Sequence, residues 1–382
     1  MKLAFKTYSL SSYLLLFGLL VFSFATRSMV ATAAYFLFAA ILLTLNFNEI
    51  LVKVQRQYWQ FMPFIVVVVL MSFVNFFRDY AVLYHLLVTF FSLGLAAVLA
   101  SNPSLFYRMS KIGLILFQSI VIVLALRIGF ANFPFEPPLE KIIPNSSANG
   151  ITSYMIILQV NLSLQEYINK KRINILLPLV TLIVAFMGYG RSSIVAALLI
   201  LIIAITVNTI FSEGLRRKIY LYGTSVISAL LFIIFIDDVL FFLEARTKLG
   251  AGFQDAQRGL IIEDYLNKIN GWTFLVGADY ENTRIEYRYN GNPHITFIRA
   301  HHIFGLPYLL CIIFLLISPL FKTKNRIDGV FIAGFLGVIF LRAATEPIIF
   351  PTQLDFFVFA LMFLLINENK DVETEHLSIE EQ

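Results

Sequence analysis

The sequence has few charged residues and almost no cysteine. Only 14% of its 382 residues are charged, against about a quarter in an ordinary soluble domain. Its single cysteine, Cys311, rules out an intramolecular disulfide. We also find no nucleotide-binding loop, no repeat of fixed period and no sizeable cytosolic domain. Together with the long apolar segments described next, the low charge content excludes a soluble enzyme, a disordered chain and a fibrous repeat protein.

What the chain has in abundance is long apolar segments. Hydrophobic residues make up 59% of the sequence and aromatic residues 15%, and they come in blocks of about 20, the length that crosses the hydrocarbon core of a bilayer. We therefore expect an all-α polytopic membrane protein with about 12 transmembrane helices. Their expected ranges are 10–26, 28–45, 61–77, 80–100, 112–130, 150–168, 175–189, 192–211, 219–240, 301–319, 329–344 and 348–366.

The basic residues predict the orientation of these helices. The net charge of +5 would suggest a nucleic-acid partner for a soluble protein, but here we interpret it first as topology, and no nucleic-acid partner is expected. Lysine-rich clusters follow every second helix, so both termini are expected in the cytoplasm. The clusters are Lys2, Lys6, Lys53, Arg56, Arg108, Lys111, Lys170, Lys171, Arg172, Arg216, Arg217, Lys218, Lys322, Lys324, Arg326 and Lys370.

This topology divides the chain into four parts. Residues 1–240 hold nine transmembrane helices, residues 241–300 form one large outer loop, residues 301–366 hold the last three helices, and residues 367–382 are an acidic cytoplasmic tail. Within the outer loop, the apolar spacing from Arg258 to Ile269 predicts a helix. The alternation of charged and apolar residues over 284–289, before Asn290-Gly291, predicts a short strand or hairpin edge.

On the expected outer side, arginine predominates over lysine. Orientation needs only positive charge, whereas a guanidinium group binds phosphate or carboxylate through two parallel hydrogen bonds. The arginines therefore suggest a phosphate-bearing or acidic ligand. The alternative is that they reach lipid headgroups or pair locally, as Arg78 could with Asp79 and Arg342 with Glu346.

Two positions carry the most specific signals. Arg191 lies in Gly190-Arg191-Ser192-Ser193, a turn between two apolar helices, where the serines are expected to cap the next helix and create an anion site. His294 precedes a helix whose first stretch is expected to end at Gly305, and its imidazole suits a general base near neutral pH.

Other ionisable groups leave alternatives open. Rival bases are present in the same loop: Asp279, Glu281 and Glu286. Asp355, near the outer third of the last span, is a functional candidate that would face a cavity or an arginine. His294 and His301 are about 10 Å apart along a helix, too far to share one ion, so no metal site is expected.

Three of these features together resemble the O-antigen polymerase/ligase superfamily of bacterial membrane glycosyltransferases. They are the turn Gly190-Arg191-Ser192-Ser193, Arg258 heading the helix before Gly271–Gly277, and Pro293-His294-Ile295-Thr296-Phe297-Ile298 followed by Gly305. The match covers roughly residues 180–320. Ile295 departs from the family, which often has Asn or Ser directly after this histidine.

The resemblance implies a GT-C type helical fold and an inverting, metal-independent glycosyl transfer without a cofactor. The donor would be a glycan on undecaprenyl pyrophosphate, and a second glycan would be the acceptor, at the periplasmic face of the bacterial inner membrane. Arg191 and Arg258 would hold the pyrophosphate and His294 would be the base. The further candidates for pyrophosphate or glycan binding are Arg288, Arg299, Arg78, Arg342 and Asp355.

The resemblance does not separate two activities. A polymerase joins lipid-linked repeat units, whereas a ligase passes the finished chain to lipid A–core. We favour the polymerase, because these proteins are so variable that a departure such as Ile295 is less surprising there. A chain-length regulator and a flippase are candidate protein partners. A lipid-linked oligosaccharide flippase or secondary transporter is the alternative from another class, since twelve spans suit it equally.

Overall fold

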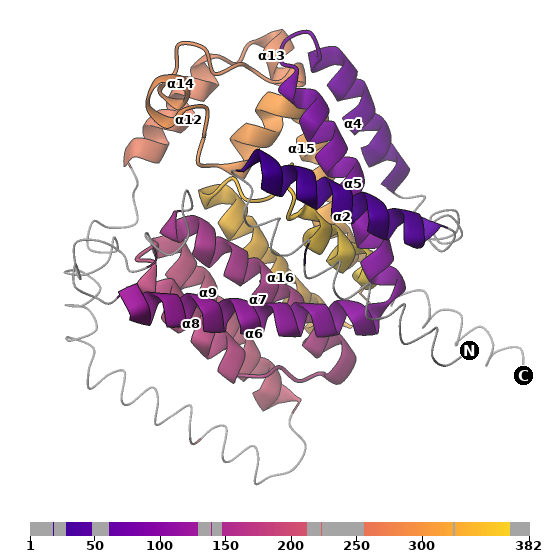
Figure 1. Ribbon diagram of the computed structural model, residues 1–382, viewed down its shortest axis with the longest axis vertical. Helices are drawn as coiled ribbons and strands as arrows, with labels where there is room; N and C mark the ends of the chain where they lie inside the picture. The colour runs from indigo at the N-terminus through magenta and orange to yellow at the C-terminus, as the bar shows by residue number, and fades with distance from the viewer. Residues whose placement is uncertain are drawn as a thin grey trace, which may run out of the picture. The chain divides into compact units, whose positions relative to one another are not determined.

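A computed structural model describes residues 18, 28–47, 61–128, 139, 147–211, 223, 256–323 and 325–366 of the chain. All regular secondary structure in these residues is helical (Figure 1). The helices are α2 (Met29–Leu45), α4 (Met62–Asn75), α5 (Ala81–Ser101), α6 (Pro103–Ile128), α7 (Ala148–Lys170), α8 (Leu176–Met187), α9 (Arg191–Ile210), α12 (Ala256–Asn267), α13 (Gly271–Val276), α14 (Arg284–Tyr289), α15 (Thr296–Lys322) and α16 (Arg326–Thr345). A further apolar helix runs from Asp355 to Ile366.

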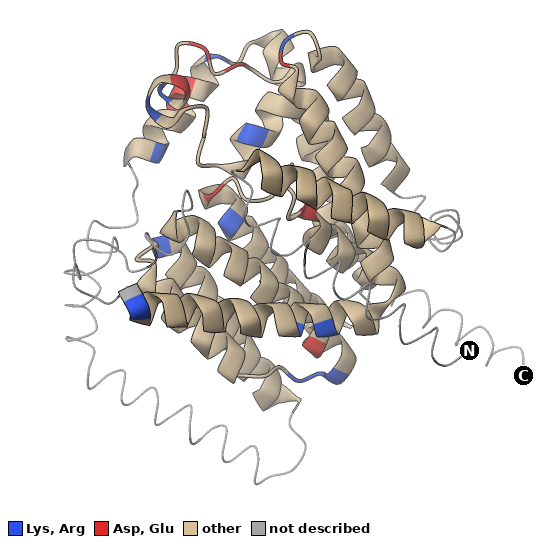
Figure 2. Ribbon diagram, viewed as in Figure 1, with Lys and Arg blue, Asp and Glu red and all other residues tan. Residues whose placement is uncertain are grey.

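Helices of membrane-spanning length confirm the helical membrane class. Five of them are long and apolar enough to cross a bilayer, namely Ala81–Ser101, Pro103–Arg127, Arg191–Ile210, Thr296–Phe321 and Arg326–Thr345. Shorter apolar helices are Met29–Leu45, Met62–Asn75, Leu176–Met187 and Asp355–Ile366. Figure 2 shows no charged residue along α2, α4 or α5. A backbone in lipid must satisfy its own hydrogen bonds, which is why apolar blocks of this length become helices.

Most expected helices agree with the structure within about five residues, with two larger differences at helix starts. α6 begins at Pro103 instead of residue 112, so Arg108 and Lys111 lie on the helix itself. The last helix begins at Asp355 instead of residue 348, because the residues before it form a turn around the Asp355 carboxylate. The total of twelve spans stays a prediction. The helices expected over 10–26 and 219–240, most of the loop over 131–149, residues 241–255 and the tail over 367–382 lie outside the described residues.

The segment from 256 to 289, which belongs to the expected outer loop, folds as three helices. The helix predicted from Arg258 is present as α12. The prediction of a strand or hairpin over 284–289 is wrong, because these residues form α14. This helix ends at Asn290, its C-cap, which has the left-handed conformation. Ile285 and Tyr289 lie one helical turn apart and both pack into one core, and this spacing suits a helix better than a strand. The core consists of Ile261, Tyr265, Ala278, Ile285, Ile295 and Ile298, with Ile269, Tyr280, Tyr289 and Phe297 packed against it.

A glycine break in α15 lets α13 approach it closely. Gly305 has a φ of 73° within α15, as expected from the sequence, and a Cβ there would collide with the carbonyl oxygen of Leu275. Gly277, just after α13, likewise leaves no room for a Cβ against the carbonyl oxygen of His301. Asn75, at the end of α4, donates from Nδ2 to the carbonyl oxygens of Val276 (2.8 Å) and Ile303 (3.0 Å). These contacts join α4, α13 and α15.

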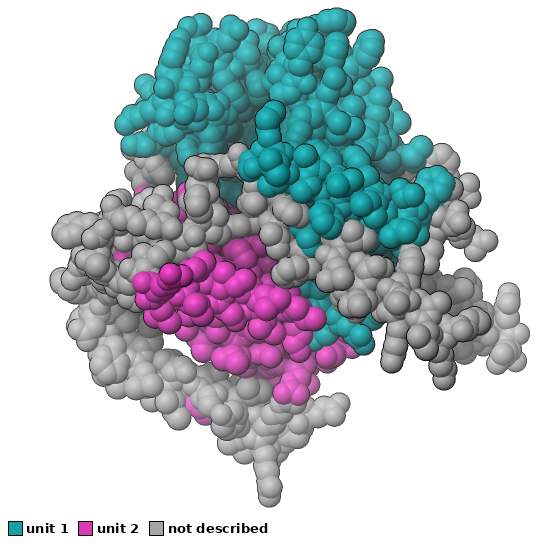
Figure 3. Space-filling model, viewed as in Figure 1, with its two compact units in different colours: residues 1–109, 257–329, 343–382 teal, residues 110–256, 330–342 magenta. Residues whose placement is uncertain are grey.

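The chain divides into two compact units, coloured separately in Figure 3. Unit 1 comprises residues 1–109, 257–329 and 343–382, and unit 2 comprises residues 110–256 and 330–342. Unit 1 therefore holds the outer-loop helices together with α4, α5 and α15. Unit 2 holds α7, α8 and α9, which pack on one another.

Candidate functional site

His294 lies in a tight turn directly before α15. Its φ is 54°, a conformation that is uncommon outside glycine and is found at turns and functional sites. Its backbone N–H donates to Oδ1 of Asn292 (3.0 Å). The Tyr289 ring meets the imidazole edge to face, with 5.0 Å between the ring centroids. The turn therefore holds the imidazole in one place, half-buried at the head of a membrane-length helix.

Glu346 is the site residue that the sequence interpretation missed. It follows the end of α16 and is buried, and its Oε1 accepts a hydrogen bond from Nη2 of Arg258 at 3.4 Å, forming an ion pair. Its backbone carbonyl accepts from Oγ1 of Thr296 (2.7 Å), two residues after His294. The available signal was a carboxylate at the end of an apolar span, which is costly to bury without a function or a partner.

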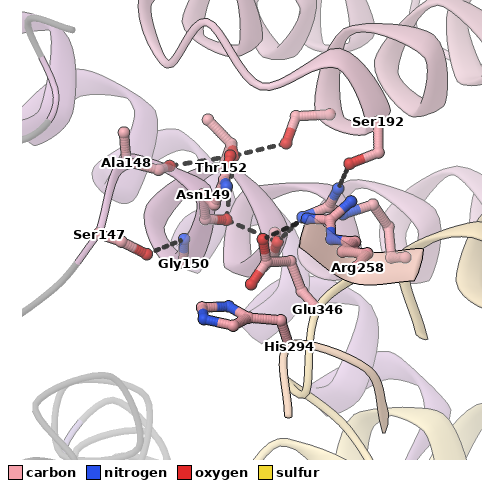
Figure 4. A network of polar contacts seen from close by, with 12 residues as sticks. Ser147, Ala148, Asn149, Gly150, Thr152, Ser192, Arg258, His294 and Glu346 are labelled. Atoms are coloured by element: carbon pink, nitrogen blue, oxygen red, sulfur yellow. Dashed lines mark hydrogen bonds and ion pairs between the residues drawn. The ribbon is translucent and has the colours of Figure 1, made fainter. Parts of the chain in front are cut away.

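Arg258, His294 and Glu346 thus form a cluster in unit 1, which we call the Glu346 cluster. In Figure 4 the imidazole of His294 lies next to the side chain of Glu346, and a dashed line marks the ion pair with Arg258. The three residues come from α12, from the turn before α15 and from the segment after α16. A cation, a carboxylate and an imidazole in one place can bind an anion, orient a hydroxyl group and accept its proton.

Arg299 and Asp355 hold the segment after Glu346. Nη1 of Arg299 donates to the carbonyl oxygen of Pro347 (3.0 Å). The Asp355 carboxylate is fully buried and accepts from the backbone N–H groups of Phe350 (2.7 Å) and Thr352 (2.8 Å) and from the Thr352 hydroxyl (3.1 Å). Both carboxylate oxygens of Asp355 therefore bind its own turn.

Arg78 connects the turn after α4 to the outer-loop helices. Its guanidinium donates to the carbonyl oxygens of Gly277 and His302, and burial lowers its pKa from the ordinary arginine value. Arg78 also borders a pocket of about 210 Å³. The other lining residues are Asp79, Asp279, Tyr280, Glu281, Glu286, Gly291 and His302. The three rival bases of the loop, Asp279, Glu281 and Glu286, therefore line this pocket.

The two histidines of α15 make structural contacts. His301 lies between the Tyr265 hydroxyl (2.7 Å from Nδ1) and the carbonyl oxygen of Phe274 (2.9 Å from Nε2). Nδ1 of His302 lies 2.6 Å from the carbonyl oxygen of Ala278. Over the described part of the chain, no group of three or more His, Cys, Asp or Glu residues could hold a metal ion.

In unit 2, Arg191 is the first residue of α9, but the serines after it do not cap the helix. The N-cap is Gly190, without a side-chain capping bond. Ser193 instead shares a 2.7 Å hydrogen bond with Thr152 of α7, and Ser192 accepts from the guanidinium of Arg342. The expected capping role is therefore wrong, because both serines lie inside the first turn and face neighbouring helices.

Two further predicted arginines have contrasting environments. Arg342 is fully buried in unit 2 and donates to the hydroxyl groups of Ser192 and Ser153. Arg288, in the last turn of α14, is exposed, and its side chain makes no ion pair or hydrogen bond with any residue that the structure describes.

The structure therefore brings His294 and Arg258 together, with Glu346 as an unexpected third member. Arg299 of α15 and Asp355 bind the segment that follows Glu346, and Arg78 lies at the pocket. Arg191 and Arg342 lie in unit 2. That they share a site with the Glu346 cluster stays a prediction. No protein-family model matches the chain, and no curated protein matches its sequence.

Proposed function

We propose that the protein is a bacterial inner-membrane polysaccharide polymerase. It would join undecaprenyl-pyrophosphate-linked oligosaccharide repeat units, of O-antigen or a related surface polysaccharide, at the periplasmic face. The observation that carries the proposal is the Glu346 cluster, in which Arg258 and His294 come together at the head of the apolar helix α15. These are two of the three positions that carry the resemblance to O-antigen polymerases and ligases.

The chemistry of this transfer suits these side chains. The acceptor hydroxyl oxygen attacks the anomeric carbon of the donor, the bond from that carbon to the pyrophosphate oxygen breaks, and the configuration inverts. His294 removes the hydroxyl proton. Arg258 stabilises the negative charge that develops on the leaving pyrophosphate, and the resemblance gives Arg191 the same role. Glu346 holds the Arg258 guanidinium in place through the ion pair.

A ligase that passes the chain to lipid A–core would use the same groups. A lipid-linked oligosaccharide flippase or secondary transporter would instead need charged groups along a transmembrane path. The Glu346 cluster favours transfer chemistry over transport, because its members come from outer-loop and helix-end segments of unit 1 rather than from the middle of a span.

Reconstitution in liposomes with lipid-linked repeat units, with and without lipid A–core, separates these activities. We expect chain extension without the core acceptor. Transfer that requires lipid A–core would indicate a ligase, and translocation without a new glycosidic bond would refute both transferases.

Single substitutions test the assignment within the same assay. We expect His294→Ala, Arg258→Ala and Arg191→Ala each to abolish chain extension while the protein still inserts in the membrane. Glu346→Gln should lower the rate by about tenfold to a hundredfold, because the Arg258 guanidinium loses its charged partner. Arg284→Ala is the matched control, since it removes an arginine from the same loop that is paired with Asp264 (2.8 Å). Equal losses in Arg284→Ala and Arg258→Ala would contradict the assignment.

A further inference from the structure

The short helix α13 exposes large apolar side chains. Trp272 is 65% exposed, Phe274 48% and Leu275 46%, and α13 contains no charged residue. The helix is nevertheless well defined, because the Asn270 side chain accepts from the backbone N–H groups of Trp272 and Thr273 (3.1 Å each) in a capping box. An ordered helix that presents tryptophan, phenylalanine and leucine outward is typical of a surface that contacts a partner or a membrane.

The contacts of α13 place it alongside membrane-length helices. Its last residue, Val276, accepts a hydrogen bond from Asn75 at the end of α4, and its backbone meets α15 at Gly305. Gly305 lies roughly 13 Å along the axis from the start of α15 at Thr296. Since the candidate span runs from Thr296 to Phe321, α13 packs beside the first part of that span.

The neighbouring surface is also aromatic. Phe73, Phe77 and Tyr80, at the end of α4 and in the turn after it, have exposed side chains. α13 packs against α4 as well as α15, and Figure 1 shows it next to the end of α4. α13 therefore packs directly against two apolar helices that also expose apolar side chains, such as Phe73 on α4 and Phe314 on α15.

We propose that α13 is an interfacial membrane anchor, with Trp272, Phe274 and Leu275 inserted at the boundary between headgroups and acyl chains. Tryptophan and tyrosine favour this boundary because their rings are apolar and their polar atoms can stay hydrated. A short helix with an apolar outer face lies in the plane of the interface. The anchor would hold the loop from α12 to α14 against the bilayer surface. It depends only on the membrane location and not on the proposed transferase activity.

The composition of the chain makes the test direct, because it contains two tryptophans, Trp59 and Trp272. Trp59→Phe leaves Trp272 as the single tryptophan, whose emission can be excited selectively over that of tyrosine in proteoliposomes. We expect lipids brominated near the headgroup end of their acyl chains to quench most of this emission, and aqueous iodide to quench little of it. The matched comparison is the triple variant Trp59→Phe, Trp272→Phe and Tyr287→Trp, since Tyr287 is 70% exposed on α14 of the same loop. In that triple variant we expect iodide to quench most of the emission and the brominated lipids to quench little of it.

Two outcomes would overturn the proposal. Strong quenching of Trp272 by iodide would place α13 in water. Emission insensitive to both agents would place it against protein, such as a second copy of the chain. If Trp59→Phe does not fold, the emission difference between the wild type and Trp272→Phe gives the same measurement.

Discussion

Several buried or half-buried charged side chains of unit 1 hold turns or chain segments in place. Arg78 donates to two backbone carbonyl groups and Arg299 to one. A guanidinium is well suited to this, because its planar fork can donate to two acceptors at once and keeps its charge when partly desolvated. The preference for arginine over lysine on the expected outer side therefore has a structural cause at these two positions. Arg258 differs, since its partner is the carboxylate of Glu346.

Asp355 should prove important for stability. Asp355→Asn keeps the size of the side chain but replaces one acceptor oxygen by an NH2 group that faces an N–H donor, at either Phe350 or Thr352. We expect the free energy of unfolding to fall by about 1–3 kcal/mol, the usual cost of an unsatisfied buried group. The measurement is the midpoint of thermal unfolding in detergent.

The matched control is Glu281→Gln, whose carboxylate is exposed. Its midpoint should stay close to that of the wild type. A role for Asp355 in ligand binding would give the opposite pattern, with an unchanged midpoint and reduced activity in Asp355→Asn.

The close contact between α13 and α15 is possible because the glycine at position 305 has no side chain. Gly305→Ala would introduce a Cβ that collides with the Leu275 carbonyl oxygen, at a residue with a φ of 73°. We expect a loss of about 2–5 kcal/mol in stability, from backbone strain together with overpacking. Gly337→Ala on α16, where a Cβ meets nothing within 4 Å, should change stability by about 1 kcal/mol or less. Comparable melting temperatures for the two variants would contradict the requirement for glycine at this contact.

Buried polar side chains connect three helices of unit 2. Thr181 of α8 accepts from Nε2 of Gln118 on α6 (2.8 Å) and donates to Oε1 of Gln159 on α7 (3.0 Å). Hydrogen bonds between membrane helices contribute about 0.6–2 kcal/mol each. They also determine which helices pair, because apolar surfaces alone could pack together in several arrangements.

Thr181→Val keeps the shape of the side chain and removes both interhelical bonds. We expect it to lower stability by about 1–3 kcal/mol, measured by unfolding in mixed micelles. Thr206→Val is the control, because the Thr206 hydroxyl is exposed and donates only within its own helix, to Ile202 (2.8 Å). An equal effect of the two substitutions would show that the interhelical hydrogen bonds add no stability.

The topology predicted from the basic residues has both termini in the cytoplasm and the large loop outside. α15 contains a candidate span, so we expect Asn290 before it and Asn325 after it to lie on opposite faces of the membrane. In a Cys311→Ala background, Asn290→Cys should react with a membrane-impermeant maleimide once the outer membrane is permeabilised. Asn325→Cys should react only after the inner membrane is opened. The reverse pattern of labelling would invert the topology.

Local sequence alone determined the helical membrane class and several elements near the cluster. Apolar blocks become helices because lipid offers the backbone no other hydrogen-bonding partner. The break in α15 at Gly305 followed from its sequence position, and α12 followed from its apolar spacing. These features depend on interactions between residues a few positions apart, which are visible in the sequence.

The partners of the polar side chains were decided by packing between distant segments. Glu346 pairs with Arg258 and is held by Thr296, neither of which is near it in the sequence, and Ser193 meets Thr152 instead of capping its own helix. α14 became a helix because Ile285 and Tyr289 share a core with residues of α12 and α15. A local pattern shows which residues are polar or apolar, but a buried polar group takes its partner from whichever segment packs against it.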